Sequence, residues 1–133
     1  MSVVLIIMGI FVTLAIPKFS RSLESARADV AGANLRAIWT AERAYWLDNR
    51  TYTSSLAVLV SLNLLDPTIT SNTSYTYLVT EADASTFTAT AQRAPNASWS
   101  GTLMITQGIS NQDGNVTGTL TCPGQASIAI GFQ

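Results

Sequence analysis

The chain begins with a long run of apolar side chains and no charge. Residues 1–16 read MSVVLIIMGIFVTLAI, and only Gly9 and Thr13 interrupt the apolar run between Val3 and Leu14. A helix that is apolar on all sides belongs in a membrane or inside a body much larger than this chain. At 1.5 Å per residue the run spans about 24 Å, less than the ~30 Å of a bilayer's hydrocarbon core. It therefore predicts a helix in a membrane or against other chains, with burial in the chain's own core as the alternative.

The stretch after Pro17 has helical periodicity and two apolar faces. Between Lys18 and Asn49 there is no Pro, and Gly32 is the only Gly. Spacings of three and four residues define one face, which we call the alanine-rich stripe: Phe19, Leu23, Ala26, Val30, Ala33, Ala37, Ala41 and Ala44. The second apolar surface consists of Leu35, Ile38, Trp39, Tyr45 and Trp46.

Two apolar faces on one helix predict two packing partners. We expect a core of Leu35, Ile38, Tyr45 and Trp46 against the rest of the chain, and we expect the alanine-rich stripe to receive neighbouring copies. Glu24 and Arg27, three residues apart, predict an ion pair on the solvent-exposed helix surface. Residues 1–49 together would form a helix about 70 Å long, bent or loosened at Pro17.

The second part of the chain alternates between apolar and polar side chains in short segments. Residues 51–55 predict a loop, and residues 56–64 predict a short helix closed by Asp66 and Pro67. A period of two predicts strands at 75–80, 86–91, 102–106 and 115–122, with a candidate fifth strand at 127–132. We therefore expect an α+β fold, in which a long N-terminal helix covers the apolar face of a small antiparallel sheet of about four strands.

The charged residues are few and unevenly distributed. Charged residues make up 11% of the chain and hydrophobic residues 47%, which excludes an intrinsically disordered chain. Residues 1–50 hold six basic and four acidic residues, whereas residues 51–133 hold one basic and four acidic residues. Because the formal net charge is −1, we expect no nucleic-acid partner held by a basic surface.

The composition also removes most enzyme chemistry. The chain has no His and one Cys, Cys122, so a Ser-His or Cys-His pair, a Cys/His zinc site and an intramolecular disulfide are excluded. Asn111, Asp113 and Asn115 alternate like calcium ligands but lack the Glu of an EF-hand, and turn chemistry explains them. We expect no catalytic residue, no metal site and no cofactor, and hence no enzyme.

Several motifs resemble the type IV pilins and the related pseudopilins of type II secretion. Gly9 lies eight residues before Pro17, as in the N-terminal helix of that family. The segment ANLRAIWTAERAYWLDNRTYTSSLAVL is similar to the family's helix end and following loop, including Asp48, Asn49 and Tyr52. The segments SYTYLVTEADASTFTATAQRAP and QDGNVTG are similar to sheet hairpins of several members. The resemblance covers nearly the whole chain.

The chain departs from the family pattern at its start. Family members begin, after cleavage of a basic leader by a prepilin peptidase, with five residues ending in a Glu. The Gly9–Pro17 register places that Glu immediately before Met1. Either the given chain starts at an internal Met or it is an unusual member that lacks the Glu. The short apolar run favours the first explanation, so we expect a cleavage motif and a Glu to be encoded in frame before Met1.

The resemblance implies a pilin fold and a structural role. It divides the chain into a hydrophobic helix segment (1–17), an amphipathic helix half (18–50) and a globular domain (51–133). It assigns membrane insertion and filament assembly to Val3, Val4, Leu5, Ile6, Ile7, Gly9, Ile10, Phe11, Leu14, Ile16 and Pro17.

The expected function is that of a subunit of a type IV pilus-like filament. The expected partners are identical subunits, the inner membrane, the prepilin peptidase and the pilus assembly machinery. The subunit would reside in the inner membrane and then in an extracellular pilus, or in a periplasmic pseudopilus. The alternatives are a major pseudopilin of a type II secretion system and a minor pilin with an adhesive or DNA-binding role.

Overall fold

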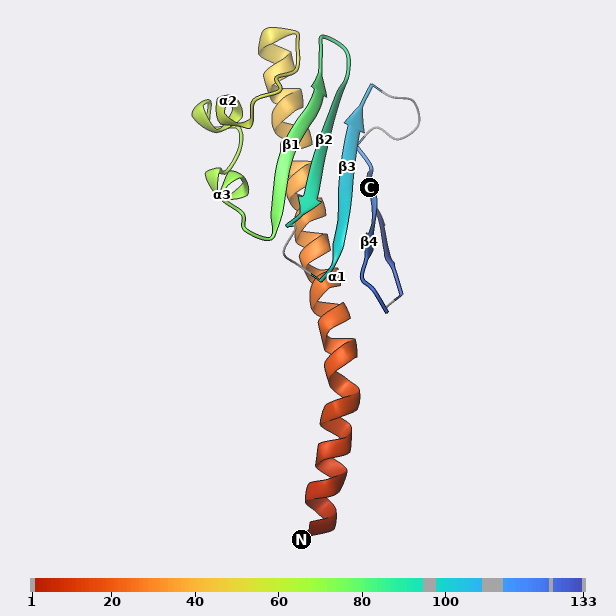
Figure 1. Cartoon of the computed structure of the whole chain (residues 1–133). Helices are drawn as coiled ribbons and strands as arrows, with labels where there is room; N and C mark the ends of the chain where they lie inside the picture. Colours follow the sequence, from red (N-terminus) through yellow and green to blue (C-terminus); the bar gives the residue numbers. More distant parts are fainter. Residues whose placement is uncertain (1, 95–97, 109–113, 125, 133) are drawn as a thin grey trace.

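The predicted α+β architecture is confirmed by the structure, a computed structural model. It describes residues 2–94, 98–108, 114–124 and 126–132, apart from the side chains of Ser2, residues 8–20 and Phe132. One long helix packs against an antiparallel sheet, and two short helices lie beside the sheet (Figure 1).

The long helix α1 runs without a break from Ser2 to Asn49. It continues through Pro17, although a Pro inside a helix removes one backbone hydrogen bond. At 1.5 Å per residue its length is about 70 Å. Its N-terminal half extends well beyond the sheet, whereas its C-terminal half lies across the sheet (Figure 1).

The sheet is a meander of five antiparallel strands in the order β1-β2-β3-β4-β5. The strands are β1 (Tyr75–Ala82), β2 (Phe87–Arg93), β3 (Ser100–Gln107), β4 (Val116–Thr121) and β5 (Ile128–Phe132). The candidate fifth strand is confirmed, because β5 pairs with β4 along its length. Strands β1 and β5 form the two edges of the sheet.

Alternation along the strands places their apolar side chains against α1. Phe87, Ala89 and Ala91 of β2 and Leu103 and Ile105 of β3 are fully buried. The helix meets them with small residues, Ala28 and Ala31, and then with Leu35 and Ile38, all fully buried. Small side chains let the helix backbone approach the sheet closely, and the larger ones fill the space nearer the helix end.

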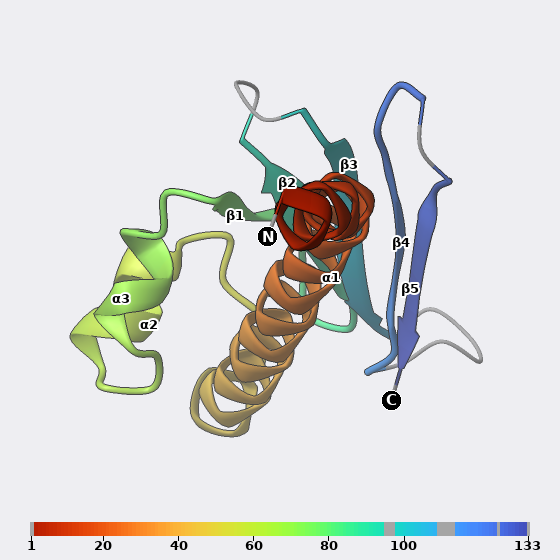
Figure 2. The same ribbon diagram turned by 90° about the horizontal axis from the view of Figure 1, so that it is seen from below.

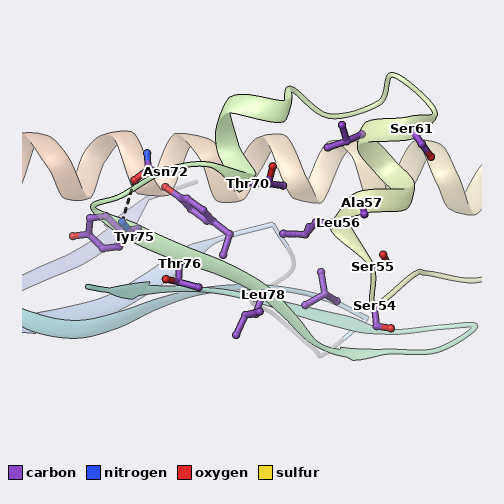
Figure 3. Close-up of a pocket in the computed structure, with 13 residues that line it drawn as sticks. Ser54, Ser55, Leu56, Ala57, Ser61, Thr70, Asn72, Tyr75, Thr76 and Leu78 are labelled. Carbon is purple, nitrogen blue, oxygen red and sulfur yellow. Dashed lines mark hydrogen bonds between the residues drawn. The ribbon is translucent and has the colours of Figure 1, made fainter. Parts of the chain in front are cut away.

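Two short helices continue the helical layer past the β1 edge (Figure 2). Helix α2 spans Leu56–Ser61 and ends earlier than predicted. Helix α3 spans Pro67–Thr70 and was not predicted, because Asp66 and Pro67 were interpreted as the end of one helix. The Asp66 carboxylate accepts a hydrogen bond from the Thr68 amide, so these residues begin a helix instead. A groove of about 630 Å³ remains between α2 and β1 (Figure 3).

Candidate functional site: the outer surface of α1

Five consecutive exposed apolar side chains lie at the N-terminal end of α1. Val3, Val4, Leu5, Ile6 and Ile7, which we call the apolar tip, expose 48–71% of their surface. They lie on the part of the helix that extends beyond the sheet (Figure 1). Consecutive residues cover all sides of a helix, so the tip is apolar all round. Exposed apolar surface of this kind marks an interaction site.

The remaining residues predicted for filament assembly are placed through their backbone alone. Gly9, Ile10, Phe11, Leu14, Ile16 and Pro17 belong to α1, and their side chains lie outside the described residues. Among the residues that the structure describes, no helix is long and apolar enough to cross a membrane.

The alanine-rich stripe is divided between the outside and the core. Leu23 and Val30 expose 42% and 58% of their surface, and Ala26, Ala33 and Ala37 are also exposed. Ala41 is buried and Ala44 is half-buried, so the stripe does not continue outward to the end of the helix. The prediction was wrong for Ala41 because a helix with 3.6 residues per turn rotates a strict repeat gradually onto the next face.

A small apolar recess adjoins the exposed stripe. It measures about 210 Å³ and lies between Leu23, Ala26 and Val30 of α1 and Tyr75 and Tyr77 of β1. The exposed stripe therefore has a depression beside it that an apolar side chain of another molecule could enter.

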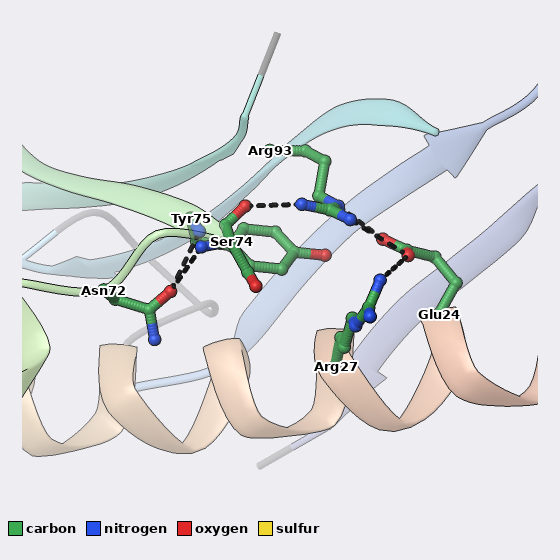
Figure 4. Close-up of polar contacts among 6 residues, drawn as sticks. All are labelled: Glu24, Arg27, Asn72, Ser74, Tyr75 and Arg93. Atoms are coloured by element: carbon green, nitrogen blue, oxygen red, sulfur yellow. Dashed lines mark hydrogen bonds and ion pairs between the residues drawn. The ribbon is translucent and has the colours of Figure 1, made fainter. Parts of the chain in front are cut away.

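A buried ion pair fixes the point where α1 leaves the sheet (Figure 4). The Arg93 Nε donates to Glu24 Oε1 at 2.6 Å, and Arg93 Nη2 donates to Glu24 Oε2 at 3.3 Å. The Arg93 Nη1 also donates to the Ser74 carbonyl at 2.8 Å, which joins the ends of β1 and β2 to the helix. Arg27 lies 3.6 Å from Glu24 and remains 45% exposed.

The prediction of a solvent-exposed Glu24–Arg27 pair was therefore wrong for Glu24. The Glu24 side chain is only 3% exposed, and its closest ion-pair partner is Arg93. The available signal was Arg93 itself, the only basic residue after residue 50. A single cation in an acidic domain is a candidate partner for a carboxylate elsewhere, but the sequence does not say which one.

The four residues predicted for the helix–sheet core occupy different depths. Leu35 and Ile38 are fully buried, and Tyr45 is half-buried and packs against the core. Trp46 lies at the margin of the core: its indole N–H donates to the Ala84 carbonyl in the β1–β2 turn at 2.8 Å. One face of the indole ring carries the Arg50 guanidinium, 4.8 Å from the ring centroid. The indole N–H reaches a turn instead of an apolar interior, which explains the position of Trp46 at the margin.

A second buried carboxyl group, Glu42, was not predicted to be buried. Glu42 is fully buried, and its Oε2 accepts a hydrogen bond from the Thr53 amide at 3.0 Å. Burial raises the pKa of Glu42 to about 7 from the ordinary 4.5, and the Thr53 hydrogen bond lowers the pKa by a smaller amount. This contact ties the loop after α1 to the helix.

The described residues contain no constellation for metal binding, since no cluster of three or more metal-ligating side chains occurs among them. Glu24 and Glu42, the buried carboxyl groups of the core, both hold structural partners. Asn111 and Asp113, weighed as calcium ligands, lie outside the described residues.

Comparison with protein-family models, with curated proteins and with solved structures gives no match.

Proposed function

We propose that this protein is the structural subunit of a helical filament of the type IV pilus kind, and that it polymerises through α1. The observation that carries the proposal is the apolar tip, Val3–Ile7, which is exposed at the end of a helix that extends beyond the globular part. In water such a surface is stable only when other molecules cover it. The pilin-like sequence motifs around Gly9 and Pro17 support the same function.

The arrangement of the two apolar surfaces of α1 supports a polymer over a closed dimer. The apolar tip and the exposed stripe at Leu23 and Val30 lie about 20 residues apart on one helix, or about 30 Å. A contact between the tip of one copy and the stripe of the next joins two different surfaces. Such head-to-tail contacts generate open helical filaments when the rotation does not close.

The proposal includes the cellular route that the resemblance implies. The precursor would reside in the inner membrane, a prepilin peptidase would process it, and the assembly machinery would add it to an extracellular pilus. The partners are identical copies of the chain, and the protein has no enzymatic activity in this role.

The proposal is tested by producing the chain in a host that has a pilus assembly system. Filaments in the sheared surface fraction are examined by electron microscopy and by immunoblotting. Ile6→Asp places a charge on the apolar tip and should abolish filaments. Leu62→Asp changes an exposed apolar residue just after α2 and should leave them intact. Filaments that persist with Ile6→Asp would contradict assembly through the tip.

A further inference from the structure

The β1 edge of the sheet has backbone groups that no other part of the described chain pairs. Strand β1 pairs with β2 alone, because it is the first strand in the order of the sheet. The Ala94 amide donates a hydrogen bond to the Ser74 carbonyl, so the backbone carbonyl of Ser74 points toward β2. In an antiparallel pair this orientation alternates along the strand. The backbone amide and carbonyl groups of Thr76 and Leu78 therefore also point toward β2, whereas those of Tyr77 and Val79 point away from the sheet.

The unpaired stretch has defined ends. At one end the Tyr75 amide already donates to Asn72 Oδ1 at 3.0 Å (Figure 3). At the other end a register shift between Val79 and Glu81 disturbs the ladder. Between these points the edge offers the Tyr75 carbonyl and both backbone groups of Tyr77 and Val79. An extended backbone is the one partner that matches donors and acceptors at this repeat along its whole length.

The groove beside this edge has room for one strand. Its volume is about 630 Å³, and Leu56, Ala57 and Val60 of α2 line it together with β1. Figure 3 shows Leu56 and Ala57 on the side of the groove opposite β1. A neighbouring strand lies about 4.8 Å away in a sheet. A second strand beyond the first would have to occupy the position of α2. The edge can therefore accept a single extended segment but not the edge of another complete sheet.

The groove also selects against charge. None of the described residues that line it is charged, and its polar lining consists of Ser, Thr, Asn and Tyr side chains. A charged side chain brought into the groove would lose hydration and find no opposite charge. Lys and Pro, two residues that often block pairing at a sheet edge, are also absent from the stretch Tyr75–Val79.

We infer that the groove between α2 and β1 is a peptide-binding site, in which an uncharged extended segment of a partner protein pairs with Tyr77 and Val79 as an additional strand. Alternate side chains of the peptide would point toward Leu56 and Val60, and the others would lie beside Leu78. The site is separate from the apolar tip and does not depend on the filament role.

The site is tested with peptides selected on the full-length chain in detergent micelles. A phage library of random ten-residue peptides is panned on the wild type, and binding of the enriched peptides is measured by fluorescence anisotropy. Ala57→Trp fills the groove and Ala57→Glu places a charge in it. Both substitutions are at an exposed helix position. Each should weaken binding at least about tenfold, whereas Leu62→Trp, outside the groove, should not change it.

N-methylation of the best peptide tests the pairing itself. Methyl groups on one set of alternate amides should abolish binding, because those amides face β1, and methyl groups on the other set should leave binding unchanged. Equal effects of the two patterns would overturn the inference, as would binding that is insensitive to Ala57→Trp. If no peptide is enriched, the inference is wrong. That result together with weaker self-association of Ala57→Trp would identify the groove as a contact between copies.

Discussion

Two carboxyl groups in the interior of this small protein are held by contacts between α1 and other parts of the chain. Glu24 is held by Arg93, 69 residues away, and Glu42 by the amide of Thr53. Both anchor the helix to the segments that pass over it. A buried carboxyl group without a partner is costly. The Glu24–Arg93 contact therefore helps to position the helix against the sheet, and the Glu42–Thr53 contact positions the loop after the helix.

The ion pair predicts that Arg93 and Arg27, the two arginines near Glu24, contribute very differently to the free energy of unfolding. Arg93→Met leaves the Glu24 carboxylate buried without its partner and should lower the free energy of unfolding by about 3–5 kcal/mol. Arg27→Met removes an exposed partner at 3.6 Å and should cost at most about 1 kcal/mol. Urea unfolding of the full-length chain in detergent measures both. Equal losses for the two variants would contradict the assignment of Arg93 as the main partner.

Glu42 predicts a stability that falls as pH rises. The unfolded chain releases this proton near pH 4.5, and the folded chain releases it near pH 7. Between these values the folded state binds more protons, so the free energy of unfolding decreases with increasing pH. Glu42→Gln keeps an acceptor for Thr53 and does not ionise. It should therefore be more stable than wild type above pH 7, by up to about 3 kcal/mol.

The measurement is a series of urea unfolding curves from pH 4 to pH 8 for both proteins. The comparison isolates Glu42 from Asp83, an exposed group whose pKa is lowered to about 2 mainly by the amides of Ser85 and Thr86. The stability difference should vanish near pH 4. A difference that stays constant over the whole range would show that Glu42 does not titrate in this window.

Neither buried carboxyl group could be predicted from the sequence. Periodicity assigns a charged residue to the solvent face, and at Asp29 and Asp48 this assignment agrees with the exposure seen. At Glu24 and Glu42 it fails, because the compensating groups come from a strand and a loop elsewhere in the chain. Only the folded arrangement of α1 and the sheet shows which acidic residue meets Arg93.

At the scale of elements, the sequence predicted the long helix and the strands well, because both depend on local periodicity. The alternation of Tyr75, Tyr77 and Val79 agrees with their burial on one side of β1. The prediction failed at α3, because Asp66 followed by Pro67 is compatible with the end of one helix and with the start of another, and here it starts α3. The sequence also did not predict which residues on one face of α1 are buried most deeply, because the depth of burial depends on where the sheet ends.

That ranking gives a prediction for two residues of α1. Leu35→Ala removes a fully buried side chain and should cost about 2–5 kcal/mol. Trp46→Ala removes one hydrogen bond and an aromatic contact with Tyr52 at the core margin, which should cost about 2 kcal/mol. This is less than the truncation of a fully buried aromatic side chain. Thermal melts that show Trp46→Ala as the more damaging change would place the core nearer the helix end.

At the scale of the whole molecule, α1 has two separate roles along its length. Burial against the sheet begins at Glu24 and continues to Glu42. Among the α1 residues whose side chains the structure describes, those buried against the sheet therefore lie in the C-terminal part of the helix, whereas the apolar tip is exposed. The same helix can thus stabilise one subunit and join several.

This separation predicts that residues 1–17 can be removed without unfolding the rest. A chain beginning at Lys18 keeps the Glu24–Arg93 pair, the Ala28–Ala41 contacts and the whole sheet. It should be a soluble monomer with a cooperative thermal transition, because the surface that is apolar all round is gone. Sedimentation velocity and circular dichroism measure the two properties.

Within this shortened chain, Val30→Asp should leave the melting temperature almost unchanged, since Val30 faces outward. Tight oligomers of the shortened chain, or the absence of a thermal transition, would contradict the division of α1 into an assembling half and a folding half.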